Sequence, residues 1–339
     1  MTQASAGQAS TSAEQLIEQV RQVAAETGFS GAVQIGAWKA AYGLADRAHQ
    51  LPNTVDTRFA LASGNKGMTA LVVMSLVEQG ALTLDTTARS LLGSDLPLID
   101  DAVTIGQLLA HTSGIGDYLD EEADWDVDDY VMTRPVHELT STEAFLPMLD
   151  GFPQAFSPGD RFGYCNGGFV VLALLAERAS GEDFHTLVRT RVLTPAGMEN
   201  SDFLRSDQLP GDSALGYLTD GRTNVFHLPV LGNGDGGLYS TLADIESFWT
   251  ALLAGTILSR VIIDQMVTPL SDVPEEEARY GLGFWLDPVG PGVRLTGFDA
   301  GVSFFTRHDP VSQLTCTVGG QRPAGAWPIA RLFPDGTNA

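Results

Sequence analysis

The spacing of hydrophobic residues predicts helices and one strand in the first quarter of the chain. Residues 13–27 repeat apolar side chains at helical spacing and are followed by a glycine, whereas residues 30–36 have the composition of a strand. A second helix is expected to start at Ser63 and to stop at Gly80, because glycine is favoured just beyond a helix end. Its broad apolar face indicates a buried, central helix.

The remaining pattern separates a helical part from a part rich in strands. Helices joined by polar loops are expected from residue 81 to about 232, without a strong strand. After Gly237, two helices precede strand-like segments at residues 281–286, 293–296, 302–307 and 313–319. Strands at both chain ends with helices between them predict an α/β (α+β) fold. The expected division is a discontinuous α/β subdomain (13–80 and 235–335), a helical subdomain (81–234), a disordered N-terminus (1–12) and a disordered tail after Pro334.

Composition narrows the classes of partner. The chain has 339 residues, 44% of them hydrophobic and 18% charged, and a formal net charge of −23, with 17 arginines and two lysines. Such acidity disfavours nucleic acids and anionic membranes as partners. No apolar run reaches the length of about 18 residues that a membrane-spanning helix needs. Residues 1–12 lack the basic and apolar regions of a secretory signal, so a cytoplasmic location is expected.

The chain offers no metal or cofactor motif. Cys165 and Cys316 form neither a disulfide framework nor a metal-binding spacing, so both are expected to be small buried residues. The six histidines are scattered singly. Residues 232–237 match G-x-G-x-x-G but lack the flanking β-α-β pattern and the acidic residue that dinucleotide binding requires. We therefore expect no cofactor and no metal, and the oligomeric state is left open.

One four-residue segment carries candidate chemistry. Ser63 and Lys66 are three positions apart at the start of an apolar helix, so the hydroxyl and the amine can meet above the first turn. The helix N-terminus adds free N–H groups and positive potential, which favour developing negative charge. The alternative is structural, because a serine that starts a helix is usually a cap and a nearby lysine is usually solvated. Spacing alone leaves both interpretations open.

Five segments, in order, resemble landmarks of a known superfamily. They are Phe59-x-x-Ala-Ser63-x-x-Lys66, Thr104-Ile-x-x-Leu-Leu-x-His111-Thr-Ser-Gly114, Phe156-x-Pro-Gly159 leading to Tyr164-Cys165-Asn166, Pro195-x-Gly-Met198 and Gly234-Asp-Gly-Gly237-Leu-x-Ser-Thr-x-x-Asp244. Together they resemble the serine β-lactamase-like superfamily, specifically the branch of class C β-lactamases and family VIII esterases. The resemblance implies a β-lactamase/transpeptidase-like fold, with an antiparallel sheet and flanking helices beside an all-helical subdomain. It places the site in the cleft between them.

The resemblance also implies roles for individual residues. Ser63 is the nucleophile, Lys66 and Tyr164 share the general-base and general-acid work, and Asn166 holds Lys66 and the substrate by hydrogen bonds. In an extended segment Tyr164 and Asn166 point the same way, while Cys165 points to the interior. A nearby cation is expected to lower the pKa of Tyr164, so that it loses its proton readily. The alternative is an ordinary turn with Tyr164 as a core aromatic.

The third expected motif departs from the family pattern. Leu295 stands where the family usually has the lysine of Lys-Thr-Gly or the histidine of His-x-Gly, a side chain that lies on the cleft wall and helps to bind a substrate carboxylate. A leucine cannot attract an anion, so the departure disfavours β-lactams and D-alanyl peptides more than it disfavours hydrolysis. Gly297 still permits close backbone approach, and the resemblance implies an oxyanion hole formed by the N–H groups of Ser63 and Phe298.

These observations predict a serine hydrolase that passes through a Ser63 acyl-enzyme, with a small-molecule ester or amide as its partner. A carboxylesterase acting on neutral esters is the first choice. A D-aminopeptidase or amidase is an alternative, although its charged substrates are expected to require a cationic pocket that the sequence does not show. A transacylase and a weak β-lactamase of the same fold are further alternatives, and a binding protein that lost turnover is the non-enzymatic alternative.

One acidic segment is expected to influence the choice of substrate. Residues 117–149 are rich in aspartate and carry Trp125, Tyr130 and His137. We expect them to overhang the cleft. A solvated surface loop is an equally good interpretation of the same composition.

Overall fold

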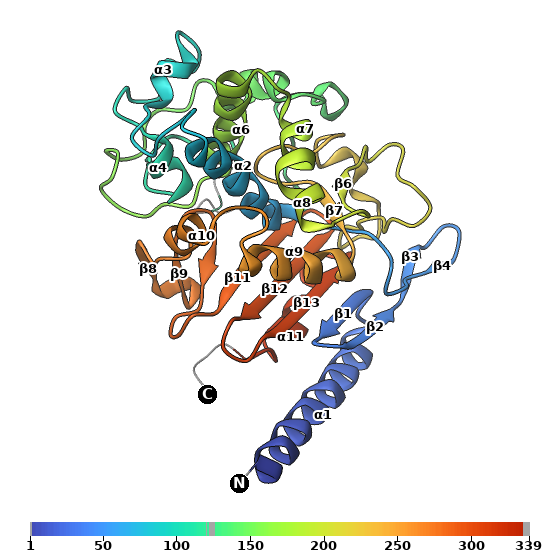
Figure 1. Ribbon diagram of the computed structural model, residues 1–339. Coiled ribbons are helices and arrows are strands. Elements are labelled where there is room, and N and C mark those ends of the chain that lie inside the picture. Colours follow the sequence, from blue (N-terminus) through green and yellow to red (C-terminus); the bar gives the residue numbers. More distant parts are fainter. Residues whose placement is uncertain (1, 120, 122–125, 335–339) are drawn as a thin grey trace.

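A large antiparallel sheet draws its strands from the two ends of the chain (Figure 1). The computed structural model describes residues 2–119, 121 and 126–334, with side chains from residue 13 onward. The order of the sheet is β2-β1-β13-β12-β11-β10-β9-β8. Its strands are β1 (Gly31–Ile35), β2 (Trp38–Tyr42), β8 (Ser271–Val273), β9 (Ala278–Tyr280), β10 (Trp285–Leu286), β11 (Val293–Asp299), β12 (Val302–Asp309) and β13 (Leu314–Gly320). Strands from both chain ends meet where β1 pairs with β13, which confirms the predicted fold class.

Strands β1, β11, β12 and β13 lie where the hydrophobic pattern predicts strands. The expected strand at residues 281–286 is wrong over most of its length, because β9 ends at Tyr280 and β10 begins only at Trp285. Gly283 in the connection has a φ of 82°, a value that an extended strand does not allow. The sequence analysis named neither β2 nor β8, and it also missed the two-residue strand β6 (Asp202–Phe203) in the helical part.

Helices cover both faces of the sheet. On one face, α1 (Thr2–Thr27) and α11 (Trp327–Ala330) pack on Cys316 and Val318, which point to the same side because side chains alternate along β13. Helix α1 begins earlier than expected, within the segment for which the sequence predicts disorder. On the other face lie α2 (Lys66–Glu78) and α9 (Leu242–Ala254), and Figure 1 shows α9 crossing in front of the strands. Cys165 and Cys316 are both buried, as predicted.

The middle of the chain is mainly helical. It contains α3 (Ala88–Leu92), α4 (Ile105–Leu109), α5 (Leu146–Leu149), α6 (Asn166–Ser180), α7 (Phe184–Val188) and α8 (Thr194–Ala196), and α10 (Arg260–Met266) follows α9. Short elements complete the described chain: β3 (Leu44–Asp46), β4 (Leu51–Pro52), β5 (Phe59–Ala60), β7 (Leu238–Ser240), η1 (Ala62–Asn65), η2 (Val136–Glu138), η3 (Thr142–Phe145), η4 (Arg189–Leu193), η5 (Asn224–Phe226) and η6 (Pro274–Glu276). Helices α2 and α6 pack against each other, so the first and second sequence motifs become neighbours. The division into two subdomains stays a prediction, and the tail after Pro334 lies outside the described residues.

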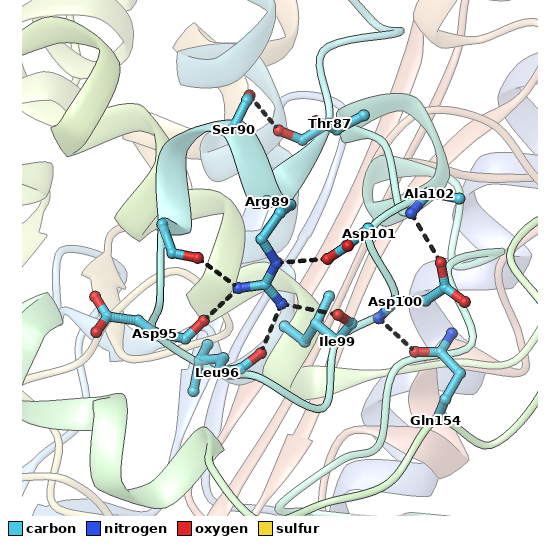
Figure 2. A network of polar contacts seen from close by, with 11 residues as sticks. Thr87, Arg89, Ser90, Asp95, Leu96, Ile99, Asp100, Asp101, Ala102 and Gln154 are labelled. Carbon is cyan, nitrogen blue, oxygen red and sulfur yellow. Dashed lines mark hydrogen bonds and ion pairs between the residues drawn. The ribbon is translucent and has the colours of Figure 1, made fainter.

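The loop after α3 is tied together by one arginine (Figure 2). The guanidinium of Arg89 donates five hydrogen bonds, to Oδ1 of Asp101 and to the main-chain oxygens of Gly93, Asp95, Leu96 and Ile99. Since a guanidinium has five N–H donors, each of them can be used here. Arg89 therefore fixes the path of residues 93–101.

Candidate active site

Ser63 lies in a tight turn between a short strand and the central helix. The predicted helix start at Ser63 is the 3₁₀ turn η1, and α2 begins at Lys66. Because residues i and i+3 eclipse in a 3₁₀ turn, Lys66 lies directly beside the serine, with Nζ 2.8 Å from Oγ. Ala62, just before the nucleophile, has a φ of 43°, which is unusual for a residue other than glycine. Such backbone strain is concentrated at functional sites.

The amine of Lys66 is buried and fully coordinated by oxygen atoms. Besides Ser63, it contacts Oδ1 of Asn166 at 2.7 Å and the main-chain oxygen of Asp235 at 2.9 Å. Only 3% of the residue is exposed. Burial lowers the pKa of Lys66 from its usual value, while the negative charges of Asp235 and Glu121 act in the opposite direction. Lys66 therefore loses its proton more readily than a solvated lysine does, and the neutral amine that results can accept a proton.

Tyr164 is the second group at the nucleophile. It lines the aromatic side of the site together with Ser63, and its ring centre lies 5.0 Å from Nζ of Lys66. The pKa of Tyr164 is raised well above its usual value, first by burial and then by the negative charge of Glu121. The sequence analysis expected the opposite direction from the nearby cation. Desolvation outweighs the cation here, so Tyr164 keeps its proton and is suited to donate it.

His111 fixes the position of Tyr164 from behind. Its Nδ1 accepts a hydrogen bond from the main-chain N–H of Cys165 at 3.1 Å, and its ring centre lies 4.4 Å from that of Tyr164. Burial lowers the pKa of His111 well below its usual value, so the imidazole is neutral. The sequence motif around His111 was noticed, but its packing role could not be deduced from the spacing.

Asn166 reaches the site as the first residue of α6. Cys165 precedes it in an extended conformation, and its Sγ accepts from the main-chain N–H of Gly168. Asp117 accepts hydrogen bonds from the N–H groups of Asn166 and Gly167, and burial raises the pKa of Asp117 to about 6. The helix start therefore aims the Asn166 side chain at Lys66, in place of the wholly extended segment that was expected.

The glycine-rich segment around Asp235 supplies a further polar group. A Cβ atom on Gly234 would lie 2.1 Å from the main-chain oxygen of Phe169, so only glycine allows this segment to approach α6 so closely. Thr69 from α2 donates to the Gly234 oxygen at 2.6 Å. The hydroxyl of Tyr118 donates to the Asp235 carboxylate. The sequence identified this segment as a landmark but gave its aspartate no role.

Strand β11 passes very close to the nucleophile. A Cβ atom on Gly297 would lie 1.9 Å from the main-chain oxygen of Leu61 and 3.0 Å from the nitrogen of Gly64. Phe298, the next residue, lines the same two cavities as Ser63. The backbones of β11 and η1 therefore approach closely beside the nucleophile, and an oxyanion hole formed by the Ser63 and Phe298 N–H groups remains a prediction.

Leu295 does not stand on the cleft wall where the sequence analysis placed it. Its side chain is buried, and its Cδ2 atom would lie 2.6 Å from a Cβ atom on Gly67 of α2. Because side chains alternate along a strand, Leu295 and Gly297 face α2 and η1, whereas Thr296 lines a cavity. Arg294 is bonded to Asp287 and is not a substitute for the missing cation.

Two cavities meet at Ser63. The first, here called the acidic cavity, has a volume of about 860 Å³ including its solvent-open part and is lined by residues that include Tyr118, Glu121, Asp235 and Asp299. The second, the aromatic cavity, has about 1080 Å³ and is lined by residues that include Phe162, Tyr164, Trp285 and Trp327. Ser63, Glu121 and Phe298 line both. A substrate bound across the serine can therefore place its two halves in different surroundings.

Among the described residues that line the acidic cavity there is a histidine, His227, but no lysine or arginine. Burial, together with the charges of Asp235 and Glu121, raises the pKa of Asp299 to about 7. Burial also raises the pKa of Asp235. The sequence analysis missed both aspartates as site residues, because nothing in their spacing connects them to Ser63.

The acidic segment at residues 117–149 contributes to this cavity. Tyr118, Leu119, Glu121, Tyr130 and Met132 line it, as expected for a segment that overhangs the site. His137 is exposed in η2, and Trp125 lies outside the described residues. Among the residues described, no group of three or more histidine, cysteine, aspartate or glutamate side chains is arranged to hold a metal ion. In the same part of the chain, no helix is both long and apolar enough to cross a membrane.

Comparison with known proteins agrees with this geometry. The sequence profile of the Beta-lactamase family matches residues 15–325. The chain belongs to the Beta-lactamase family. This confirms the resemblance inferred from the sequence motifs, and the family's relatives are serine hydrolases that include penicillin-binding, esterase and D-aminopeptidase proteins.

Individual relatives show the range of the family. The crystal structure of a penicillin-binding protein from Bacillus halodurans superposes with a TM-score of 0.86 at 35% identity, covering 92% of this chain and 98% of that one. Esterase EstB of Burkholderia gladioli is 34% identical over 175 residues, 50% of this chain and 44% of the esterase. A D-aminopeptidase of Brucella anthropi is 28% identical over 261 residues, 76% of this chain and 48% of that protein. The chain thus spans about half the length of these two curated relatives.

Proposed function

We propose that this protein is a serine hydrolase that works through an acyl-enzyme on Ser63. The observation that carries the proposal is the 2.8 Å contact between Ser63 Oγ and Lys66 Nζ at the junction of two cavities. A structural serine cap would have no need of a buried amine beside it or of open space in front of it. The relatives in the family support the same chemistry.

Acylation begins with proton transfer from Ser63 to Lys66. Burial lowers the pKa of Lys66, so the amine can act as a general base while Oγ attacks the carbonyl carbon of the substrate. The backbone N–H groups of Ser63 and Phe298 stabilise the oxyanion. Asn166 and the Asp235 carbonyl hold the lysine in place throughout.

Breakdown of the tetrahedral intermediate needs a proton on the leaving group. Tyr164 lines the same cavity as Ser63 and keeps its proton, so it can deliver that proton to the departing alcohol or amine and recover one from Lys66. Water then attacks the acyl-enzyme and releases the acid and free Ser63. A second alcohol or amine in place of water gives acyl transfer.

A carboxylesterase acting on neutral esters is the first choice of activity. The carboxylates of Glu121, Asp235 and Asp299 repel a substrate that carries its own carboxylate, which disfavours β-lactams. Met132 and Leu228 give the same cavity an apolar wall suited to an uncharged acyl group. The similarity to esterase EstB supports this choice.

The acidic cavity favours a D-aminopeptidase or amidase as second candidate. The ammonium group of a D-aminopeptidase substrate is bound by carboxylates. The expectation that such a substrate requires a cationic pocket was therefore wrong for that part of the substrate. Asp235 and Asp299 line the cavity beside the nucleophile and can balance such a charge. The similarity to the D-aminopeptidase of Brucella anthropi supports this candidate.

Labelling with a fluorescent fluorophosphonate tests the common step. We expect an adduct on Ser63 that is lost in Ser63→Ala and kept in Ser312→Ala, a control at an exposed serine. A folded protein without any adduct would overturn the hydrolase proposal and favour a binding protein.

A matched substrate panel separates the two candidates. It consists of p-nitrophenyl propionate, nitrocefin and the pair propionyl and D-alanyl p-nitroanilide, which differ in a single amino group. A carboxylesterase hydrolyses the ester best and does not prefer the amine. A D-aminopeptidase prefers the D-alanyl anilide, and Asp299→Asn should remove that preference. Activity mainly on nitrocefin would overturn both candidates.

A further inference from the structure

A buried guanidinium nitrogen far along the sequence from Ser63 has no hydrogen-bond partner. Nη2 of Arg47 is shielded from solvent, and no described residue offers it an acceptor. The guanidinium lies 3.9 Å from the ring centre of Tyr217, and the Arg47 main-chain N–H donates to the Tyr217 hydroxyl at 2.7 Å. The arginine is therefore held in place through its ring contact and its backbone, while its charge is left without a counterion. A guanidinium nitrogen that is buried without an acceptor is costly.

A second arginine lines the same hollow. Arg322 is exposed, and none of the described carboxylates forms an ion pair with it. Burial lowers the pKa of Arg47, and the positive charge of Arg322 lowers it further. The contrast with other arginines is informative, because Arg205 and Arg222 each pair with an aspartate two residues away. In a chain with a net charge of −23, two neighbouring arginines without carboxylate partners are unexpected.

The hollow between these arginines is large enough for a small molecule. It has a volume of about 910 Å³ including its solvent-open part, and none of the residues that line it in the described chain is acidic. Thr27, Ser30 and Thr219 add hydroxyl groups to its wall. We call this site the arginine hollow. It shares no lining residue with the acidic or aromatic cavity.

We propose that the arginine hollow binds a small molecule through an oxyanion, either a carboxylate or a phosphate. Guanidinium groups present several N–H donors in a plane that matches both kinds of oxyanion. A bound oxyanion would supply the negative charge that both arginines lack and would relieve the repulsion between them. Among the wall hydroxyl groups, Thr27 already donates to the Val23 oxygen and Ser30 to Gln321, so the Thr219 hydroxyl is the candidate donor to a further oxygen atom. The site is independent of the hydrolase reaction.

Isothermal titration calorimetry with sodium phosphate and, separately, sodium acetate tests the proposal. Sodium chloride keeps the ionic strength constant, because screening alone changes the behaviour of an acidic protein. We expect saturable binding of at least one anion, with a dissociation constant at least tenfold higher in Arg322→Gln. Arg205→Gln, at an arginine paired on the surface, should bind as the unmodified protein does. Binding of phosphate alone or of acetate alone then distinguishes the two kinds of oxyanion.

Two results would overturn the proposal. One is the absence of saturable binding for both anions, and the other is binding that Arg322→Gln leaves unchanged. Arg322 is the primary target because it is exposed, so its replacement should not disturb folding. Arg47→Gln serves as a second variant, with circular dichroism to show that loss of the Tyr217 contact has not unfolded it. Fluorophosphonate labelling of Ser63 should be the same in all variants, which separates this site from the hydrolase proposal.

Discussion

Nζ of Lys66 lies 2.7 Å from Oδ1 of Asn166, so an amide at the start of α6 holds the amine that faces the nucleophile. If this amine is the general base, Lys66→Met should lower kcat by roughly 10³-fold or more, since general-base catalysis and activation of the serine are lost together. Stopped assays with p-nitrophenyl propionate measure the change. The only other lysine of the chain gives a matched control, and Lys39→Met should retain activity. Equal losses in both variants would contradict the assignment.

The protonated state of Tyr164 leads to a prediction about leaving groups. Because its pKa is raised, Tyr164 is a proton donor, and Tyr164→Phe should lower kcat by about 10²-fold for alkyl esters and anilides. p-Nitrophenolate leaves without a proton, so its esters should lose much less. The ratio of kcat for ethyl and p-nitrophenyl propionate in the two proteins measures the effect. A loss that is equal for both leaving groups would indicate that Tyr164 only positions the substrate.

Asp299 makes stability depend on pH. Its pKa is raised from 3.8 to about 7 in the folded protein, so it contributes stability below pH 3.8 that is lost as the pH rises through about 7. Asp299→Asn changes the free energy of unfolding at both pH values. That change should be more stabilising at pH 8 than at pH 5 by on the order of 2–3 kcal/mol. Urea unfolding at the two pH values measures this difference. Asp160→Asn, at an exposed aspartate, should have the same effect at both.

The arrangement of Ser63, Lys66, Tyr164 and Asn166 could be predicted because each residue sits in a short motif. Spacing at a helix start fixes Ser63 against Lys66, and the second motif follows from the resemblance. The fold class follows from strands at both chain ends. The predicted direction of the shift in the Tyr164 pKa was wrong. The shift depends on how deeply Tyr164 is buried, and a short motif does not contain that information.

The acidic cavity and the place of Leu295 could not be predicted for a related reason. Asp235 and Asp299 come from segments far apart in the sequence, and only the folded chain brings both to the cavity beside Ser63. Leu295 lies in a strand that was correctly predicted. The face of this strand that packs on α2 depends on the close backbone approach that Gly67 and Gly297 allow. These are properties of packing between elements, and local patterns do not contain them.

The close approach of β11 to η1 predicts a strong effect at Gly297. A methyl group there would lie 1.9 Å from the Leu61 oxygen, so one of the two backbones must move. Gly297→Ala should lower kcat/KM by at least 10²-fold, because the shift displaces the Ser63 and Phe298 N–H groups. Gly211→Ala, where a methyl group meets open space, is the matched control. Crystal structures of both variants, with unchanged backbones around Ser63, would contradict this explanation.

Arg89 tests how the helical part is held together (Figure 2). Arg89→Met keeps much of the side-chain volume but removes five hydrogen bonds, four of them to main-chain oxygens of the loop after α3. At a net contribution of about 0.5–1.5 kcal/mol for each bond, the free energy of unfolding should fall by about 2.5–7.5 kcal/mol. Urea denaturation measures the fall, and Arg205→Met, which loses a solvent-screened surface pair with Asp207, should leave the free energy of unfolding nearly unchanged. Similar losses in the two variants would mean that the loop finds other partners. None of residues 93–101 lines either of the two cavities that meet at Ser63. The value of kcat for the folded Arg89→Met protein should therefore not change.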